Sequence, residues 1–145
     1  MDEDDDGIGE IIQRFGLHPA EEHLDAIRAI IAEQATLGWD AHVELMRTCS
    51  VMLFNAGHVT DSLLIWQAKE TNWDSHCSID IQLLCGAGLP GTLAYLQAEA
   101  SRNPEAAEAL TYLGDCARPG FDFDDFTPEA RSAMYDRYYL PDTGG

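Results

Sequence analysis

The amino-acid sequence predicts an all-α protein, built as one domain of seven to eight helices that form antiparallel hairpins. Three observations predict this class. Apolar residues recur every three or four positions along most of the chain, which places them on one face of a helix. Capping residues and prolines stand where these stripes begin, and glycines stand where several end. The length of 145 residues and the apolar content of 46% are typical of one globular domain, for which about 45–50% is usual.

The first 36 residues contain an acidic arm and two predicted helices. Residues 1–6 are expected to form a flexible acidic arm, residues 7–140 the helical domain, and residues 141–145 a flexible tail. A short helix is expected to end at Gly16, and Pro19 is expected to open a helix over residues 19–36. The two apolar stripes are Ile8, Ile11, Ile12 and Phe15, and then Leu24, Ile27, Ile31 and Ala35.

The third and fourth helices are expected to enclose the most apolar part of the chain. Asp40 is expected to open the third helix, and Gly57 follows it as a left-handed C-cap. Residues 48–54 carry almost no polarity, which predicts burial on most sides. Thr60 is expected to cap the fourth helix, which continues to about Thr71. One face of the third helix would comprise Trp39, Val43, Met46, Ser50 and Leu53.

Residues 78–84 fit two kinds of secondary structure. Alternation of apolar residues is typical of a strand, and it occurs at Ile79, Ile81 and Leu83. Spacing of three and four is typical of a helix, and it occurs at Cys77, Ile81, Leu84 and Gly88. Asp74 as an N-cap, together with the helical neighbours, favours a helix over this stretch.

The last third of the chain contains three predicted helices and an acidic, aromatic connector. Pro90 is expected near the start of one helix, Asn103 caps the next, and Thr127 caps the last. The connector is residues 121–126. The predicted stripes are Leu89, Leu93, Leu96 and Ala100, then Ala106, Leu110, Leu113 and Ala117, and finally Met134 and Tyr138 with Tyr135 as a further member.

A weak internal echo bears on how the helices are arranged. Residues 53–57 resemble residues 84–88, and residues 63–68 resemble residues 93–98. A period near 30 residues suits a short αα-solenoid-like stack of hairpins. Two short copies rich in Leu and Ala also arise in an irregular bundle. Both arrangements stay open at this point.

The charge balance restricts the class of partner. Eight Lys and Arg stand against 26 Asp and Glu, for a net charge of −18. A field of this sign repels nucleic acid and anionic lipid, and the chain has no apolar run near the roughly 18 residues that a membrane span needs. We therefore expect no nucleic acid and no membrane as partner, but a basic protein or peptide. Solubility alone also accounts for an acidic surface.

The cysteines indicate a reducing compartment. Cys49, Cys77, Cys85 and Cys116 form no CxxC pair, and three of them lie in apolar stretches. The first ten residues are acidic rather than basic and then apolar, so they do not resemble a signal peptide. A cytoplasmic location with reduced thiols is the expectation.

Two places are candidates for binding a partner. Trp73 and Asp74 lie in a predicted turn between two helices, and tryptophan is enriched at the centres of protein interfaces. In the connector, Asp122, Phe123, Asp124 and Asp125 alternate charge with large apolar rings, which would suit a basic, apolar groove on another protein. The connector rings would otherwise pack back onto the helices, because exposed phenylalanines favour aggregation.

These features predict a non-catalytic acidic interaction module, such as an inhibitor or immunity-type binder of a basic partner. The alternative is an enzyme or small-molecule binder with a pocket between helices, to which Trp66, His76 and Asp80 would contribute. The chain has no nucleophile, nucleotide or zinc motif, so no catalytic residue, metal ligand or cofactor is assigned. An apolar contact between copies around Tyr135, Tyr138, Tyr139 and Leu140 is a third option, and the oligomeric state is left open.

Overall fold

The computed structural model describes the backbone of residues 3–140 and the side chains of residues 7–140. The protein is all-α, as predicted: it is 75% helical, with eight α-helices and no strand among the described residues. The α-helices are α1 (Glu3–Phe15), α2 (Leu24–Ala35), α3 (Val43–Ala56), α4 (Ser62–Lys69), α5 (Trp73–Ser78), α6 (Leu89–Ala100), α7 (Pro104–Cys116) and α8 (Pro128–Tyr139). Short 3-10 helices are η1 (Glu21–His23), η2 (Gly38–Asp40), η3 (Val59–Asp61) and η4 (Ile81–Cys85).

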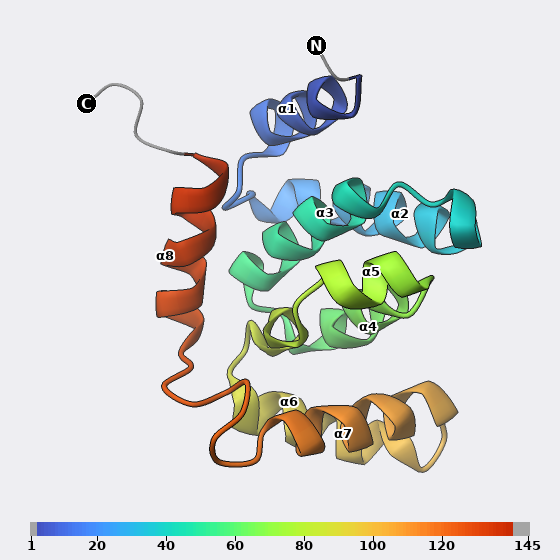
Figure 1. Cartoon of the computed structure of the whole chain (residues 1–145), viewed down its shortest axis with the longest axis vertical. Coiled ribbons are helices and arrows are strands. Elements are labelled where there is room, and N and C mark those ends of the chain that lie inside the picture. Colours follow the sequence, from blue (N-terminus) through green and yellow to red (C-terminus); the bar gives the residue numbers. More distant parts are fainter. Residues whose placement is uncertain (1–2, 141–145) are drawn as a thin grey trace.

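The helices are grouped around α3. Helix α2 lies against α3, α6 lies against α7, and α3 also contacts α1, α4, α5 and α8. In Figure 1, α8 runs across one end of the other helices instead of continuing their series. In a solenoid each unit contacts only its neighbours, so α8 departs from that pattern. Neither the short stack of hairpins nor the irregular bundle is confirmed, and both stay predictions.

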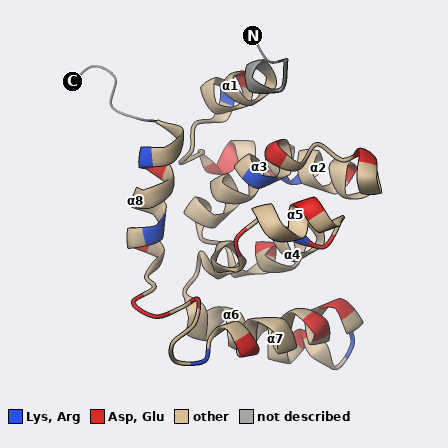
Figure 2. Ribbon diagram, in the orientation of Figure 1, with Lys and Arg blue, Asp and Glu red and all other residues tan. Residues whose placement is uncertain are grey.

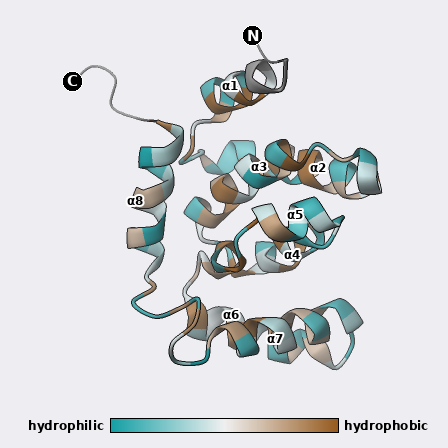
Figure 3. Cartoon of the chain, viewed as in Figure 1, coloured by the Kyte–Doolittle hydropathy of each residue, from teal (hydrophilic) through white to brown (hydrophobic). Residues whose placement is uncertain are grey.

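The core is centred on the second half of α3. All residues from Thr48 to Phe54 are buried, as the lack of polar residues predicted. The buried stripe of α2 is also the predicted one, with Leu24, Ile27 and Ile31 inside. Figure 3 shows hydrophobic segments, in brown, on both α2 and α3. The central position of α3 follows from its apolar character on nearly every side.

The start of α3 differs from the prediction. His42, not Asp40, is the N-cap, and its ring nitrogen accepts a hydrogen bond of 3.1 Å from the Leu45 amide. Asp40 lies in the separate helix η2, as does Trp39. Gly38 precedes them with a φ of +56°, a left-handed conformation that favours glycine and interrupts an α-helix. Trp39 is therefore outside the buried face on which it was expected.

The ambiguous stretch 78–84 is neither one helix nor a strand. Helix α5 is capped by Asn72 rather than Asp74, and it ends at Ser78. Ile79 and Asp80 are extended, and η4 follows. The predicted helix fails here because a lysine side chain, described below, takes the carbonyl groups that a continuing α-helix would use.

The caps of the last two helices are those predicted. The Asn103 side chain accepts a hydrogen bond of 3.0 Å from the Glu105 amide, and the Thr127 hydroxyl accepts one of 3.1 Å from the Ala130 amide. The buried face of α8 was predicted only in part. It contains Tyr135, the one fully buried side chain of that helix, whereas Met134 and Tyr138 are exposed. Residue Tyr135 packs on α3, and this contact sets the rotation of α8.

The two ends of the chain bear on the predicted arm and tail. Helix α1 begins at Glu3, so residues 3–6 belong to a helix rather than to a flexible arm. Residues 1–2 and the predicted tail, residues 141–145, lie outside the described residues.

Two segments of the internal echo meet at Gly86. A Cβ atom at this position would overlap the carbonyl oxygen of Phe54 at the end of α3. We expect Gly86→Ala to lower the free energy of unfolding by about 2–3 kcal/mol, because neither backbone can move without disturbing the core. Urea unfolding followed by circular dichroism measures this. The matched control is Gly91→Ala, where an added Cβ meets nothing within 4 Å; equal stability of the two variants would contradict the close approach.

Candidate functional site

Two exposed tryptophans lie on adjoining turns. Trp39 lies between α2 and α3 and is 73% exposed, and Trp73 begins α5 and is 65% exposed. The side-chain amide of Asn72 donates a hydrogen bond of 2.9 Å to the carbonyl oxygen of Gly38. This bond joins the residues that immediately precede the two tryptophans, so the two turns are neighbours (Figure 1). We call these turns, residues 38–40 and 72–74, the tryptophan face.

Each turn of the tryptophan face also carries an exposed carboxylate. Asp40 follows Trp39, and Asp74 follows Trp73. The predicted binding residues Trp73 and Asp74 are therefore both at the surface. Sequence reasoning missed Trp39, although its neighbours Gly38 and Asp40 are residues that favour turns and could have indicated one.

A row of aromatic rings leads from the tryptophan face toward the core. Trp73 stacks on His76, with ring centroids 5.2 Å apart and an interplanar angle of 14°. His76 meets Tyr112 edge to face at 5.6 Å, and Tyr112 lies 5.5 Å from Trp66. Such pairs hold one another in place. The row connects α5 with α7 and α4.

Both ring nitrogens of His76 have partners. Nδ1 lies 2.5 Å from a carboxylate oxygen of Glu70, and Nε2 lies 3.5 Å from the hydroxyl of Tyr112. These contacts fix the ring between Trp73 and Tyr112. The arrangement makes His76 a structural link between the turn after α4 and the face of α7.

An acidic groove lies between α4 and α7, with a volume of about 550 Å³. Trp66 is buried at its base, and Tyr112 is half-buried beside it. Glu108 and Asp115 lie four positions before and three positions after Tyr112, so they share its face of α7. We call this site the acidic groove; it is lined by Trp66, Glu70, Ala107, Glu108, Thr111, Tyr112 and Asp115.

A buried lysine lies next to the acidic groove, close to the ring of Tyr112. Lys69 is only 4% exposed, and its Nζ donates to the carbonyl oxygens of His76 at 2.6 Å and Ile79 at 2.5 Å. The ammonium also lies 5.9 Å from the centroid of Tyr112. Burial lowers the pKa of Lys69 from its ordinary value. Only the fold reveals this role.

The predicted pocket of Trp66, His76 and Asp80 is not assembled as one site. Trp66 lines the acidic groove, whereas His76 does not line it and contacts two of its lining residues, Glu70 and Tyr112. Asp80 instead accepts a short hydrogen bond from the hydroxyl of Tyr135, and Arg131 lies 3.8 Å away. Asp80 thus has the partner that a half-buried carboxylate requires, and its role is to hold α8.

The predicted connector site lies apart from the tryptophan face. Phe123 is buried at 8% exposure and packs edge to face on Phe126 at 5.0 Å. It is therefore part of the core rather than a partner-binding residue, because the connector folds back over the helices. The ring that stays exposed is Phe121, which Arg118 covers at 5.4 Å.

The connector aspartates are exposed, but one of them has a structural role. The carboxylate of Asp124 accepts hydrogen bonds of 2.9 and 3.1 Å from the Gly120 amide. Asp122 is held through its backbone, since its carbonyl oxygen accepts a hydrogen bond of 2.8 Å from the side-chain amide of Gln82. Asp125 has a φ of 60° and continues the turn. Figure 2 shows these acidic residues on the loop that leads into α8, far from the turn between α2 and α3.

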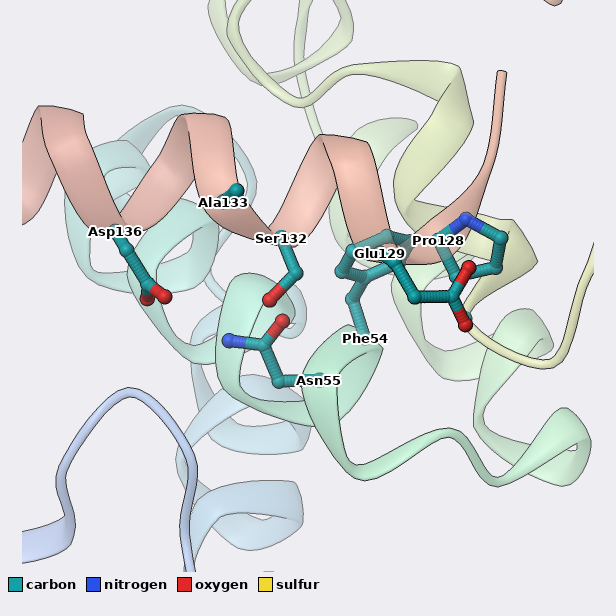
Figure 4. A pocket seen from close by; sticks show the side chains of 8 residues that line it. Phe54, Asn55, Pro128, Glu129, Ser132, Ala133 and Asp136 are labelled. Atoms are coloured by element: carbon teal, nitrogen blue, oxygen red, sulfur yellow. The ribbon is translucent and has the colours of Figure 1, made fainter.

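Another cavity, of about 390 Å³, follows the seam between α8 and the end of α3 (Figure 4). The side-chain amide of Asn55 faces Ser132 in this view, and it donates a hydrogen bond of 2.7 Å to the carbonyl oxygen of Leu17. At the other end of the seam, His18 Nε2 lies 2.8 Å from a carboxylate oxygen of Asp136. These contacts hold α8 and the segment after α1 against α3. The cavity therefore lies within the packing interface between these elements.

No group of three or more His, Cys, Asp or Glu residues in the part of the chain that the structure describes is arranged to hold a metal ion. Each described helix is too short or too polar to cross a membrane. No protein-family model, curated protein or solved structure matches the chain.

Proposed function

We propose that the protein is a non-catalytic binding module that captures a basic protein or peptide on its tryptophan face. The observation that carries this proposal is the exposure of Trp39 and Trp73 on turns joined by one hydrogen bond. A single exposed apolar residue is normal, whereas large exposed apolar side chains that gather in one region mark interaction sites. Tryptophan in particular is enriched among the residues that dominate binding energy.

The charge of the protein selects the sign of the partner. The net charge is −18, and both turns of the tryptophan face carry an aspartate. A basic surface would be steered toward this face and would associate faster at low ionic strength. Nucleic acid and anionic lipid would be repelled.

The state of two of the four thiols and of His76 supports a module without catalysis. Burial raises the pKa of Cys49 and Cys85 to about 12, so neither forms the thiolate that a nucleophile requires. His76 is held by Glu70 and Tyr112, which suits a positioning role in the aromatic row.

A capture experiment with a matched variant tests the proposal. The protein is immobilised and exposed to lysate of its source cells at about 0.1 M and 1 M salt, where the screening length falls from about 10 to 3 Å. We expect a basic protein to be retained at low salt and released at high salt. The Trp39→Ala/Trp73→Ala variant should bind that purified protein at least about 30-fold more weakly.

This variant keeps the whole charge of the protein, so it separates specific binding from general attraction to a polyanion. The control is Phe121→Ala/Tyr138→Ala, which removes two exposed rings elsewhere and should leave binding within about twofold. Equal retention by the tryptophan variant and the wild type would refute the tryptophan face. Retention of nothing at either salt would refute the module itself.

A further inference from the structure

We propose that the acidic groove receives an arginine side chain of the basic partner. The inference rests on the proposed function, because it assumes that the arginine belongs to a protein bound at the tryptophan face. The aromatic row from Trp73 through His76 and Tyr112 to Trp66 makes that face continuous with the groove. One partner can therefore contact both.

The electrostatics of the groove favour a cation. Its lining includes three carboxylates, Glu70, Glu108 and Asp115, and no Lys or Arg. Glu70 is already paired with His76 at 2.5 Å, and among the described residues no Lys or Arg forms an ion pair with Glu108 or Asp115. A positive charge in the groove would therefore be attracted mainly by Glu108 and Asp115. A cation there would also lie close to the rings of Tyr112 and Trp66, which attract cations through their faces.

The chemistry selects arginine over lysine. A guanidinium is planar, stacks on aromatic rings and donates to carboxylates in a fixed fork, whereas an ammonium is compact and strongly hydrated. A groove with an aromatic base and carboxylates at both ends offers the partners that a guanidinium can use at once. An ammonium would use the carboxylates but lose more hydration in reaching the rings.

The protein already builds the same combination for one of its own arginines. The guanidinium of Arg47 lies 4.8 Å above the ring of Tyr138 and 5.8 Å from that of Tyr139. It also pairs with Glu44 at 3.4 Å. The acidic groove has the same aromatic and carboxylate components; the buried ammonium of Lys69 lies 5.9 Å from the Tyr112 ring, but no arginine lines the groove. An arginine of a basic partner would supply that guanidinium.

Titration with small blocked amino acids tests the groove without the partner. The probes are acetyl-arginine methylamide, its neutral isostere acetyl-citrulline methylamide, and acetyl-lysine methylamide. Amide chemical shifts are followed by two-dimensional NMR on isotope-labelled full-length protein. We expect saturable shifts with the arginine probe, confined to residues 66–70 and 107–115, with weaker binding of lysine and none of citrulline.

Charge-matched variants identify which carboxylates are used. Glu108→Gln/Asp115→Asn changes exposed residues and should weaken arginine binding about fivefold. The control Glu22→Gln/Glu129→Gln removes the same charge from other exposed positions and should change it less than about twofold. Tyr112→Leu should also weaken binding, and its folding is checked by circular dichroism.

Three results would overturn the arginine site: equal shifts from citrulline, lysine binding as tight as arginine, or shifts spread over carboxylates across the whole surface. Failure of the groove and failure of the proposed function are distinguishable. If the tryptophan variant abolishes capture of the basic protein while the arginine probe does not bind the groove, the module stands and the groove does not. If the arginine probe binds the groove while the tryptophan variant still captures the basic protein, the groove stands and the tryptophan face does not.

Discussion

Replacing Arg28 by methionine is expected to lower the free energy of unfolding by about 3 kcal/mol. Arg28 on α2 binds Asp61 on η3 through two hydrogen bonds, with Nε to Oδ1 at 2.8 Å and Nη2 to Oδ2 at 3.0 Å. Asp61 is 5% exposed, so the variant leaves a buried carboxylate without its cation. We place the loss at the low end of the range for such pairs because Arg28 itself is partly exposed.

The hydrogen bonds to Asp61 also raise the pKa of Arg28 above its ordinary value, so the cation persists at every pH of interest. Thermal and urea unfolding measure the loss. The double variant Arg28→Met/Asp61→Asn removes both charges and should regain most of it. Asp25 is an exposed second partner of Arg28 at 2.9 Å, and Asp25→Asn should cost less than about 0.5 kcal/mol. If Arg28→Met lowered the free energy of unfolding by no more than Asp25→Asn does, the stabilising role of the Arg28–Asp61 pair would be disproved.

Replacing Tyr135 by alanine is expected to cost about 4 kcal/mol, because it removes the only fully buried side chain of α8 among the described residues. The ring meets Phe54 of α3 at a centroid distance of 6.3 Å and an angle of 73°. Its hydroxyl donates to Asp80. Burial and this bond raise the pKa of Tyr135, so the neutral hydroxyl is the donor.

Hydrogen exchange of the α8 amides, together with urea unfolding, measures this second effect. Tyr135→Phe keeps the ring and should cost about 1–2 kcal/mol, since Asp80 then loses its hydroxyl partner. The surface control is Tyr138→Ala, at a residue 60% exposed, for which about 0.5 kcal/mol is expected. If Tyr135→Ala were no more damaging than Tyr138→Ala, α8 would be held by its seam with α3 rather than by this ring.

The elements that the sequence predicted well are those with local causes. Asn103 and Thr127 cap α7 and α8 because their side chains reach amides only two or three residues away. The stripe of Leu24, Ile27 and Ile31 is buried because its spacing alone places three apolar groups on one face. Such features need no knowledge of the rest of the chain.

The elements that the sequence left open or predicted wrongly depend on distant contacts. The stretch after α5 leaves the helical path because Lys69 binds the carbonyls of His76 and Ile79. Phe123 is buried because the connector folds back onto the helices. In each case the local pattern allowed more than one conformation, and a contact from elsewhere in the chain selected one.

The sequence by itself determined the all-α class, the caps of α7 and α8 and the strongly acidic charge. Periodicity, capping and charge are properties of neighbouring residues and of composition. Only the tertiary structure decided that the turn of Trp39 adjoins the turn of Trp73 and that Glu70 of the turn after α4 shares a groove with Glu108 and Asp115 of α7. These residues are more than 30 positions apart, and their proximity depends on how the helices pack around α3, because side chains far apart in the chain meet only once the core between them has formed.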